Sequence, residues 1–294
     1  MTTTFEHHLK YNHLIDDTPS TALSLLFDSL RNTEHNLSKT QLKEAISKGA
    51  LWLTRANHTQ RLRRVKKSLQ HGDQLHFYYH SGVLASVVCD AKLISDETDY
   101  SVWYKPYGML SQGSKWSDHC TLSRYAQQQL TPERSVFIVH RLDRAATGLM
   151  LIAHTKKAAR ALSAMFECRT TTDNTLNKYY QIIVHGNHNK FDQPQVINTE
   201  VAGKSARSSF TCLAYDPDKD RSLIEVKIDS GRKHQIRLHA ASIGLPVVGD
   251  RLHGIADVSE TSNLQLCAVS LSFNCPISGV QKHFELESHL KPQL

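Results

Sequence analysis

One short stretch, His140-Arg141-Leu142-Asp143-Arg144, places an acidic residue between two arginines, a combination that can do acid–base or nucleophilic chemistry. It lies between two apolar runs, residues 135–139 and 149–153, which are short and rich in strand-forming side chains. We therefore expect two buried strands joined by a loop at the end of a sheet, where rigid scaffolds commonly hold catalytic groups. The same pattern also fits a structural ion pair beside a turn, because ion-pair networks are common in proteins.

The chain around this motif is expected to alternate between short strands and helices. The strands are predicted at residues 100–104, 178–184, 222–228, 266–273 and 280–287, and the helices at residues 121–130, 155–166 and 233–243. Strands outnumber helices and no internal repeat is present, so the sequence predicts an α+β fold.

The chain before this region has the pattern of a smaller lobe. We divide the sequence into a polar tail or covering strand at residues 1–20, a lobe at residues 21–92 and a larger domain at residues 93–294. Apolar spacing, a Ser38 N-cap and turn residues predict lobe helices at residues 21–31 and 38–48 and lobe strands at residues 50–54 and 75–79.

Between the two lobe strands runs a basic stretch with no acidic residue from Arg55 to Gln70. Its candidate RNA contacts are Arg61, Arg63, Arg64, Lys66 and Lys67. The lobe resembles the small alpha-L RNA-binding domain in the segments Leu37-Ser38-Lys39, Ile46-Ser47-Lys48-Gly49 and His71-Gly72-Asp73-Gln74-Leu75. It departs from that family at Lys39, where arginine is usual, and at Thr54-Arg55-Ala56-Asn57, where Val-Asn-Gly is usual. The alternative is a solvated basic face on a small α/β lobe.

Composition and charge exclude several classes of protein. The 294 residues carry a formal net charge of +7, which suits a polyanionic partner but is also common on inert surfaces. The six cysteines form no C-x-x-C pair, which argues against a zinc ribbon or a redox dithiol and fits a reducing cytosol. No signal-peptide pattern, membrane-length apolar run or metal-binding histidine motif is present. We expect a cytoplasmic protein without a membrane or a metal.

Three motifs in fixed order carry a resemblance to a known family. They are His140-Arg141-Leu142-Asp143-Arg144 with Thr147-Gly148, then Lys178-x-Tyr180, then Gly231-Arg232-Lys233-His234-Gln235-Ile236-Arg237 with Gly249-Asp250 behind it. The order and spacing resemble the RluA-type pseudouridine synthase family, and Lys105-Pro106-x-Gly108 and the stretch from Leu266 to Pro276 match its other landmarks. The resemblance covers residues 100–287. It implies a mixed, mainly antiparallel catalytic sheet and the isomerisation of uridine to pseudouridine in RNA.

The implied reaction is compatible with the residue types. Breaking the glycosidic C–N bond develops charge on the ribose, which a nearby carboxylate can stabilise or attack as a nucleophile. One carboxylate is enough, because the departing base is also the group that returns. No redox step or hydrolysis occurs, so neither a cofactor nor a metal is expected. Covalent attack on the ribose and elimination through a glycal both remain open.

The resemblance assigns roles to single residues. Asp143 matches the catalytic aspartate, Arg237 the basic residue that pairs with it, and Tyr180 the active-site tyrosine that stacks on uracil or helps to move the C5 proton. For Arg237 the alternative is a helix-surface contact to phosphate, and for Tyr180 it is a place in the core. Further candidate RNA contacts at this site are Arg141, Arg144, Arg232, His234 and Gln235.

The sequence also departs from this family at several positions. Ala145-Ala146-Thr147-Gly148 replaces the usual residues after the aspartate, and Lys233 replaces threonine. His253 stands where tyrosine is common, and Cys267 where histidine is common. None of these changes removes the three catalytic candidates, but they prevent the transfer of a substrate from any one member.

We therefore predict a cofactor-independent RNA pseudouridine synthase that acts on structured RNA, ribosomal RNA before transfer RNA. It is expected to be a monomer and to bind no DNA. The first alternative is a non-catalytic RNA-binding or ribosome-assembly factor on the same fold. The second is a glycosidase, which requires a second paired carboxylate that does not recur near the motifs.

Overall fold

The computed structural model describes residues 8–16, 21–31, 33, 35–167, 176–191, 194–255 and 260–294. Contacts within the chain divide it into two compact units. The first contains residues 1–87 and 112–124, and the second contains residues 88–111 and 125–294. The division near residue 92 that we made from the sequence did not assign residues 112–124 to the first unit. Their assignment depends on contacts with residues that are distant in sequence.

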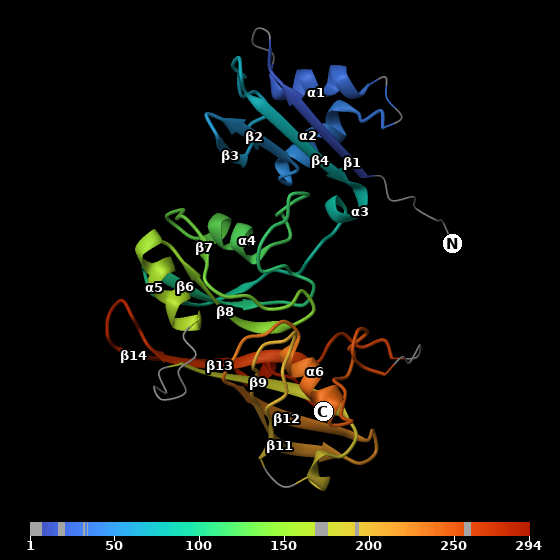
Figure 1. Ribbon diagram of the computed structural model, residues 1–294, viewed down its shortest axis with the longest axis vertical. Coiled ribbons are helices and arrows are strands. Elements are labelled where there is room, and N and C mark those ends of the chain that lie inside the picture. The colour runs from blue at the N-terminus through green and yellow to red at the C-terminus, as the bar shows by residue number, and fades with distance from the viewer. Residues whose placement is uncertain are drawn as a thin grey trace. The chain divides into compact units, whose positions relative to one another are not determined.

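The first unit is an antiparallel sheet with two helices packed on one of its faces (Figure 1). Its elements are β1 (His8–Leu14), α1 (Ala22–Leu30), α2 (Lys39–Ser47), β2 (Leu51–Arg55), β3 (His58–Arg61), β4 (Gln74–His80) and α3 (Ser81–Leu84). The strand order is β1-β4-β2-β3. Residues 8–14 of the predicted tail therefore form an edge strand, while residues 1–7 and 17–20 lie outside the described residues.

Local sequence explains the boundaries of these elements. Ser38 caps α2 in a capping box with Gln41, which satisfies backbone N–H groups at the start of the helix. Ala56 and Asn57 both have positive φ and form a two-residue turn, which folds the start of the basic stretch back as β3. Leucine, isoleucine and phenylalanine side chains of the helices and strands fill the core between them. Its members include Leu26, Leu30, Leu42, Ile46, Leu51, Leu53, Leu75 and Phe77.

The second unit is built on one large sheet. Its elements are β5 (Lys92–Asp96), β6 (Tyr100–Lys105), α4 (Leu122–Gln129), β7 (Phe137–Ile138), β8 (Thr147–Ala153), α5 (Lys156–Glu167), β9 (Leu176–His185), β10 (Gln195–Ile197), β11 (Ser208–Asp216), β12 (Arg221–Ile228), α6 (Gln235–Ser242), β13 (Leu266–Asn274) and β14 (Gln281–Glu285). Two short 3-10 helices lie at His188–Lys190 and Ser288–Leu290. Helix α4 begins in the first unit, which ends at Arg124.

The large sheet has the order β10-β11-β12-β9-β13-β8-β6-β5, with β14 beside β13 and β7 beside β8. Every pair is antiparallel except β13 with β8. One core packs β6, β8 and β13 with α5, and a second packs β9, β11 and β12 with α6. The predicted α+β class with a mixed, mainly antiparallel sheet is confirmed.

The motif that contains Asp143 lies where the prediction placed it, in the loop from β7 to β8. The parallel contact of β8 with β13 is unusually close at Gly148, whose φ is +111°. A Cβ atom there would lie 2.3 Å from the carbonyl oxygen of Ala268. Glycine is therefore required for β8 to leave the loop alongside β13.

None of the helices in the described part of the chain is long and apolar enough to cross a membrane.

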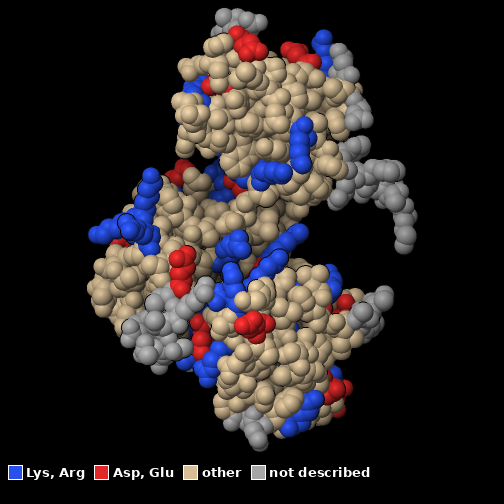
Figure 2. All heavy atoms as spheres, in the orientation of Figure 1, with Lys and Arg blue, Asp and Glu red and all other residues tan. Residues whose placement is uncertain are grey.

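Figure 2 shows Lys and Arg side chains on the visible surface of both units, with acidic side chains interspersed. Net charge alone therefore does not locate an RNA-binding surface.

The close approach at Gly148 predicts a large loss of stability for Gly148→Ala. The methyl group would meet the backbone of Ala268 while the residue is held at positive φ, which together cost about 3 kcal/mol or more. Urea denaturation followed by circular dichroism measures this. Gly231→Ala is the control, because a Cβ atom there has no heavy atom within 4 Å. Equal stability of the two variants would contradict the packing argument.

Candidate functional site

The loop that carries Asp143 is held by hydrogen bonds from a preceding segment of the second unit. The Ser111 hydroxyl donates to the carbonyl of Leu142 at 2.8 Å and accepts from its N–H at 3.0 Å. The backbone N–H of Gly108 donates to the carbonyl of Arg144. Residues on both sides of Asp143 are thus fixed, and the carboxylate stands between two anchored positions.

Lys105 is the buried anchor of the same segment. Its side chain is fully buried, and its Nζ donates to the carbonyl oxygens of Met109 at 2.8 Å, Pro106 at 3.2 Å and Arg144 at 3.4 Å. Burial lowers the pKa of Lys105 to about 7, against the opposing effect of the Asp143 charge. Lys105 therefore joins the Lys105-Pro106-x-Gly108 turn to the loop that carries Asp143.

Arg237 lies between two carboxylates. Its Nε and Nη2 donate to the two oxygens of Asp250 at 2.8 and 2.5 Å, and its Nη1 lies 3.3 Å from Oδ2 of Asp143. The side chains of Arg237 and Asp250 are 5% and 1% exposed, whereas that of Asp143 is 28% exposed. The bidentate contact fixes the guanidinium plane, so that its remaining nitrogen faces a carboxylate that a substrate can reach.

The electrostatics follow from this arrangement. Burial alone would lower the pKa of Arg237, but the hydrogen bonds and charges of Asp250 and Asp143 raise it, so the cation is permanent. Burial alone would raise the pKa of Asp250, but Arg237 and the N–H groups of Leu252 and His253 lower it. A fixed positive charge therefore faces Asp143 at every physiological pH.

Tyr180 lies on β9 between strands β12 and β13, and it lines a pocket with Asp143. Other residues of this pocket are Arg141, Arg232, His234, Gln235 and Arg237. Burial, together with the charge of Asp143, raises the pKa of Tyr180, so its hydroxyl is protonated at neutral pH. The structure therefore brings the three predicted catalytic residues to one pocket.

His234 lines this pocket and contacts a second histidine, His253. His234 adopts a left-handed backbone conformation, with φ of 59°, directly before α6. Its Nδ1 lies 2.9 Å from Nε2 of His253, and its Nε2 lies 3.8 Å from Oδ2 of Asp143. Burial lowers the pKa of His234; Asp143 opposes this effect, while the charges of Arg237, His253 and Lys233 reinforce it.

Gln235 is placed differently from the other predicted RNA contacts. It is 3% exposed, and its amide is occupied by hydrogen bonds with Ser230, Arg232, Arg207 and Ser208. These bonds close the turn that precedes α6 and leave the amide no outward-facing donor. Gln235 therefore holds the loop that presents Arg232 and His234.

Arg141 and Arg144 are exposed on either side of Asp143. Arg141 lines the pocket with Tyr180, and Arg144 lines a second pocket that also contains Asp143. Further cations of this second pocket are Lys233 and Arg251, which sequence reasoning did not select as site residues. The only signals for them were the departure of Lys233 from the family pattern and the position of Arg251 after Gly249-Asp250.

His140, the first residue of the motif, lines neither of the two pockets that contain Asp143. Its Nε2 accepts the backbone N–H of Leu151 at 2.9 Å, and its ring stacks on Phe166 at 4.1 Å. Burial, with the charge of Lys178, lowers the pKa of His140 to about 3. It is thus a neutral residue that ties the loop to β8.

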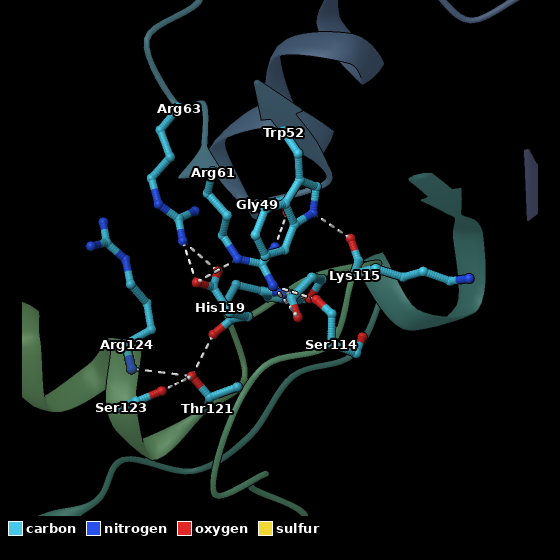
Figure 3. Close-up of polar contacts among 12 residues, drawn as sticks. Gly49, Trp52, Arg61, Arg63, Ser114, Lys115, His119, Thr121, Ser123 and Arg124 are labelled. Carbon is cyan, nitrogen blue, oxygen red and sulfur yellow. Dashed lines mark hydrogen bonds and ion pairs between the residues drawn. The ribbon is translucent and has the colours of Figure 1, made fainter. Parts of the chain in front are cut away.

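Two of the five predicted RNA contacts in the first unit are already engaged within it (Figure 3). Arg61 contacts the carbonyl oxygens of Gly49 and Ser114, and its Nε lies 3.2 Å from Asp118. Arg63 forms an ion pair with the same Asp118. Arg64, Lys66 and Lys67 are exposed.

Asp250 and His253 are the main site residues without a predicted role. Gly249-Asp250 was noted only as a landmark, because nothing in the local sequence says that Asp250 reaches Arg237. Within the described part of the chain, no group of three or more His, Cys, Asp or Glu side chains is placed to hold a metal ion.

Comparisons with known proteins agree with the family resemblance. The family model described as RNA pseudouridylate synthase matches residues 99–242. An uncharacterised RNA pseudouridine synthase of Aquifex aeolicus is 27% identical over 86% of each chain. The ribosomal large subunit pseudouridine synthase D of Zymomonas mobilis is 33% identical over 53% of this chain and 54% of its own length.

Two further matches complete the comparison. The tRNA pseudouridine synthase C of Pectobacterium carotovorum is 30% identical over 49% of this chain and 45% of its own length. The chain thus spans only about half the length of two of these three curated relatives. The solved structure of human RNA pseudouridylate synthase domain containing 4 matches with a TM-score of 0.51 and 20% identity, over 67% of this chain and 88% of that one. This likeness supports the fold.

Because Asp250 is the buried charge partner of Arg237, we predict that the loss of stability in Asp250→Asn depends on pH. Removing the charge leaves Arg237 buried with a weaker partner and costs about 3 kcal/mol at neutral pH. The pKa of Asp250 is lowered in the folded state, so its contribution is fully present above the ordinary value of 3.8 and is lost as the pH falls through the lowered pKa. Urea denaturation across this range should show the difference from wild type shrinking in acid.

The control for this experiment is Asp229→Asn. Asp229 pairs with Arg207 at the surface, where such ion pairs contribute little to stability. A difference between wild type and Asp250→Asn that stays constant down to the most acidic pH would contradict the linkage to this carboxyl group.

Proposed function

Because the chain belongs to the RNA pseudouridylate synthase family, whose members are isomerases, we propose that it converts uridine to pseudouridine in RNA with Asp143 as the catalytic carboxylate. The observation that carries the proposal is the pairing of a reachable carboxylate with a buried, permanently charged arginine. This pair stands at a pocket that also contains Tyr180.

In this reaction the bond between N1 of uracil and C1′ of ribose breaks, and a bond between C5 and C1′ forms. The C5 proton then leaves, and N1 gains a proton, so atoms and charge balance without any oxidant or cofactor. Asp143 acts on the ribose, whose C1′ becomes electron-deficient when the base departs. Arg237 pairs with Asp143 and orients it, since the position of Arg237 is itself fixed by Asp250.

Tyr180 is proposed to stack on the uracil while the base turns. The ring lies in the pocket wall, and the raised pKa keeps its hydroxyl protonated. A protonated phenol donates a hydrogen bond but does not itself remove a proton. Stacking and hydrogen bonding are therefore the proposed roles of Tyr180, ahead of direct proton abstraction from C5.

The target nucleotide must be turned out of its stack before Asp143 reaches C1′. The exposed Arg141 and Arg144 flank the carboxylate and are proposed to hold the neighbouring phosphates. Arg232 and His234 are proposed contacts in the first pocket, and Lys233 and Arg251 in the second. Phosphate groups on both sides of the flipped nucleotide would thus meet cations.

The substrate is proposed to be structured RNA, ribosomal RNA before transfer RNA. The relative that names the ribosomal large subunit is slightly more similar to this chain than the relative that names tRNA, at 33% against 30% identity. We further propose that the protein acts in the cytoplasm as a monomer. The choice of substrate is tested by mapping pseudouridine across total RNA in a strain that lacks the gene.

The central prediction is that Asp143→Asn abolishes pseudouridine formation. The variant keeps the size of the side chain and removes the charge that meets the ribose, so activity should fall by about three orders of magnitude or more. Pseudouridine mapping in the deletion strain, rescued by wild type or by Asp143→Asn, measures this. Asp216→Asn is the matched control, since this partly exposed aspartate also pairs with a cation but lies outside the pocket.

Two outcomes would contradict this proposal. Rescue by Asp143→Asn as complete as by wild type would favour a non-catalytic RNA-binding factor. Release of free uracil without an isomerised product would favour glycoside cleavage.

A second prediction separates the ring of Tyr180 from its hydroxyl. Tyr180→Phe keeps the stacking surface, so it should retain much more activity than Tyr180→Ala, which loses about 1–3 kcal/mol of stacking on the base. RNA labelled with tritium at uracil C5 reports proton loss directly, because the label is released only after the C5–C1′ bond forms. A complete block of tritium release in Tyr180→Phe would instead make the hydroxyl part of the proton transfer.

A further inference from the structure

The four-stranded sheet of the first unit has one face that its helices do not cover. Alternate residues of each strand point away from the core, and none of the outward positions in these strands is acidic. These positions are His8, Lys10, Asn12 and Leu14 on β1, Gln74, His76, Tyr78 and His80 on β4, Trp52 and Thr54 on β2, and Thr59 and Arg61 on β3.

Residues 112–124 add a second tryptophan and a lysine to this face. The Trp116 ring lies 5.9 Å from that of Tyr78 and 5.6 Å from that of His80, measured between ring centres. The Lys115 ammonium lies 5.4 Å from the ring centre of Tyr78 and 5.3 Å from that of Trp116, while that of Lys10 lies 5.9 Å from Trp116. His8, Lys10, Tyr78, His80, Lys115 and Trp116 form what we call the aromatic–basic face.

Polar contacts within the first unit hold this segment in place (Figure 3). The indole Nε1 of Trp52 donates to the carbonyl of Lys115 at 2.9 Å. Arg61 and Arg63 share the carboxylate of Asp118. The backbone next to Trp116 is thus fixed, and the ordering cost of this platform is met before any ligand arrives.

We propose that the aromatic–basic face binds unpaired nucleotides of the RNA substrate by stacking bases on Trp116 and Tyr78. Lys10 and Lys115 are exposed, and their contacts with the rings are weak enough for the ammonium groups to turn to phosphates. Aromatic rings interleaved with cations on an open sheet are a common platform for single-stranded RNA. This inference rests on the proposed function in one respect, which is that RNA is the ligand of the protein.

The arginines of the basic stretch support this assignment. Arg61 and Arg63 are committed to Asp118 and to backbone carbonyl groups, so they serve the architecture of the unit. Burial lowers the pKa of Arg61, with Asp118 opposing and Arg63 reinforcing the effect. The cations that remain open on this side of the sheet include Lys10 and Lys115, and both lie beside Trp116.

The test uses the full chain and a fluorescein-labelled oligouridine of about 12 nucleotides, a length within the usual range for such platforms. Fluorescence anisotropy gives the dissociation constant. Trp116→Ala and Tyr78→Ala should each weaken binding about tenfold, whereas Trp116→Phe should stay near wild type because its ring still stacks. Lys10→Ala and Lys115→Ala should each reduce the slope of log affinity against log salt by about 0.7.

The matched control is Lys39→Ala. Lys39 also lies over an aromatic ring, with its Nζ 4.6 Å from the ring centre of Phe27, but it belongs to helix α2. Its removal should leave oligouridine binding unchanged. Weaker binding in Lys39→Ala with no effect of Lys10→Ala would place the RNA over the helices and overturn the proposal.

Wild-type affinity in folded Trp116→Ala and Tyr78→Ala would also overturn it, with folding checked by circular dichroism. If either alanine variant unfolds, Lys10→Ala and Lys115→Ala decide, because both lysines are exposed. The rescue experiment with Asp143→Asn tests the proposed function by itself, so the two proposals can fail separately. Loss of binding only in the face variants supports this inference even if Asp143 proves non-catalytic.

Discussion

The site depends on one buried guanidinium that two carboxylates share. An arginine side chain that is 5% exposed is stable only when its charge is balanced and its donors are used. Asp250 balances the charge of Arg237 and accepts two hydrogen bonds from it. Asp250 is itself held by the N–H groups of the following turn. Because Asp250 is fully engaged, Asp143 can remain partly exposed beside the same cation, and its charge is available to a substrate.

The loops around this pair use the same principle of a buried polar side chain that fixes backbone groups. Lys105 donates to three carbonyl groups, one of which is that of Arg144 in the Asp143 loop, and Ser111 both donates to and accepts from the backbone of Leu142. Gln235 closes the turn before α6 with four partners. Each of these three side chains is buried. In the protein interior hydrogen bonds are strong, and a polar group without a partner is costly. The loop positions are thus set before RNA binds.

Most regular elements could be predicted from the sequence, because their apolar spacing is strong and local. The bounds of helix α5 and of strands β7 and β8, on either side of the Asp143 loop, lie within a few residues of the predicted bounds. Strands β3, β5, β10 and β11 were missed, since their burial patterns come from neighbouring strands and their sequences are short, polar or irregular. Family motifs located the pocket residues, but they did not predict Asp250 as the principal partner of Arg237.

The arginines show why charge in the sequence does not by itself identify RNA contacts. Arg61 and Arg63 lie in a basic stretch without acids, yet their partner Asp118 stands 55 residues after Arg63 and reaches them only through the fold. Two nitrogens of the Arg237 guanidinium are likewise engaged by Asp250. An arginine can bind phosphate only if its donors are still open in the folded chain. Exposure after folding, which the sequence does not encode locally, therefore separates structural cations from those available to RNA.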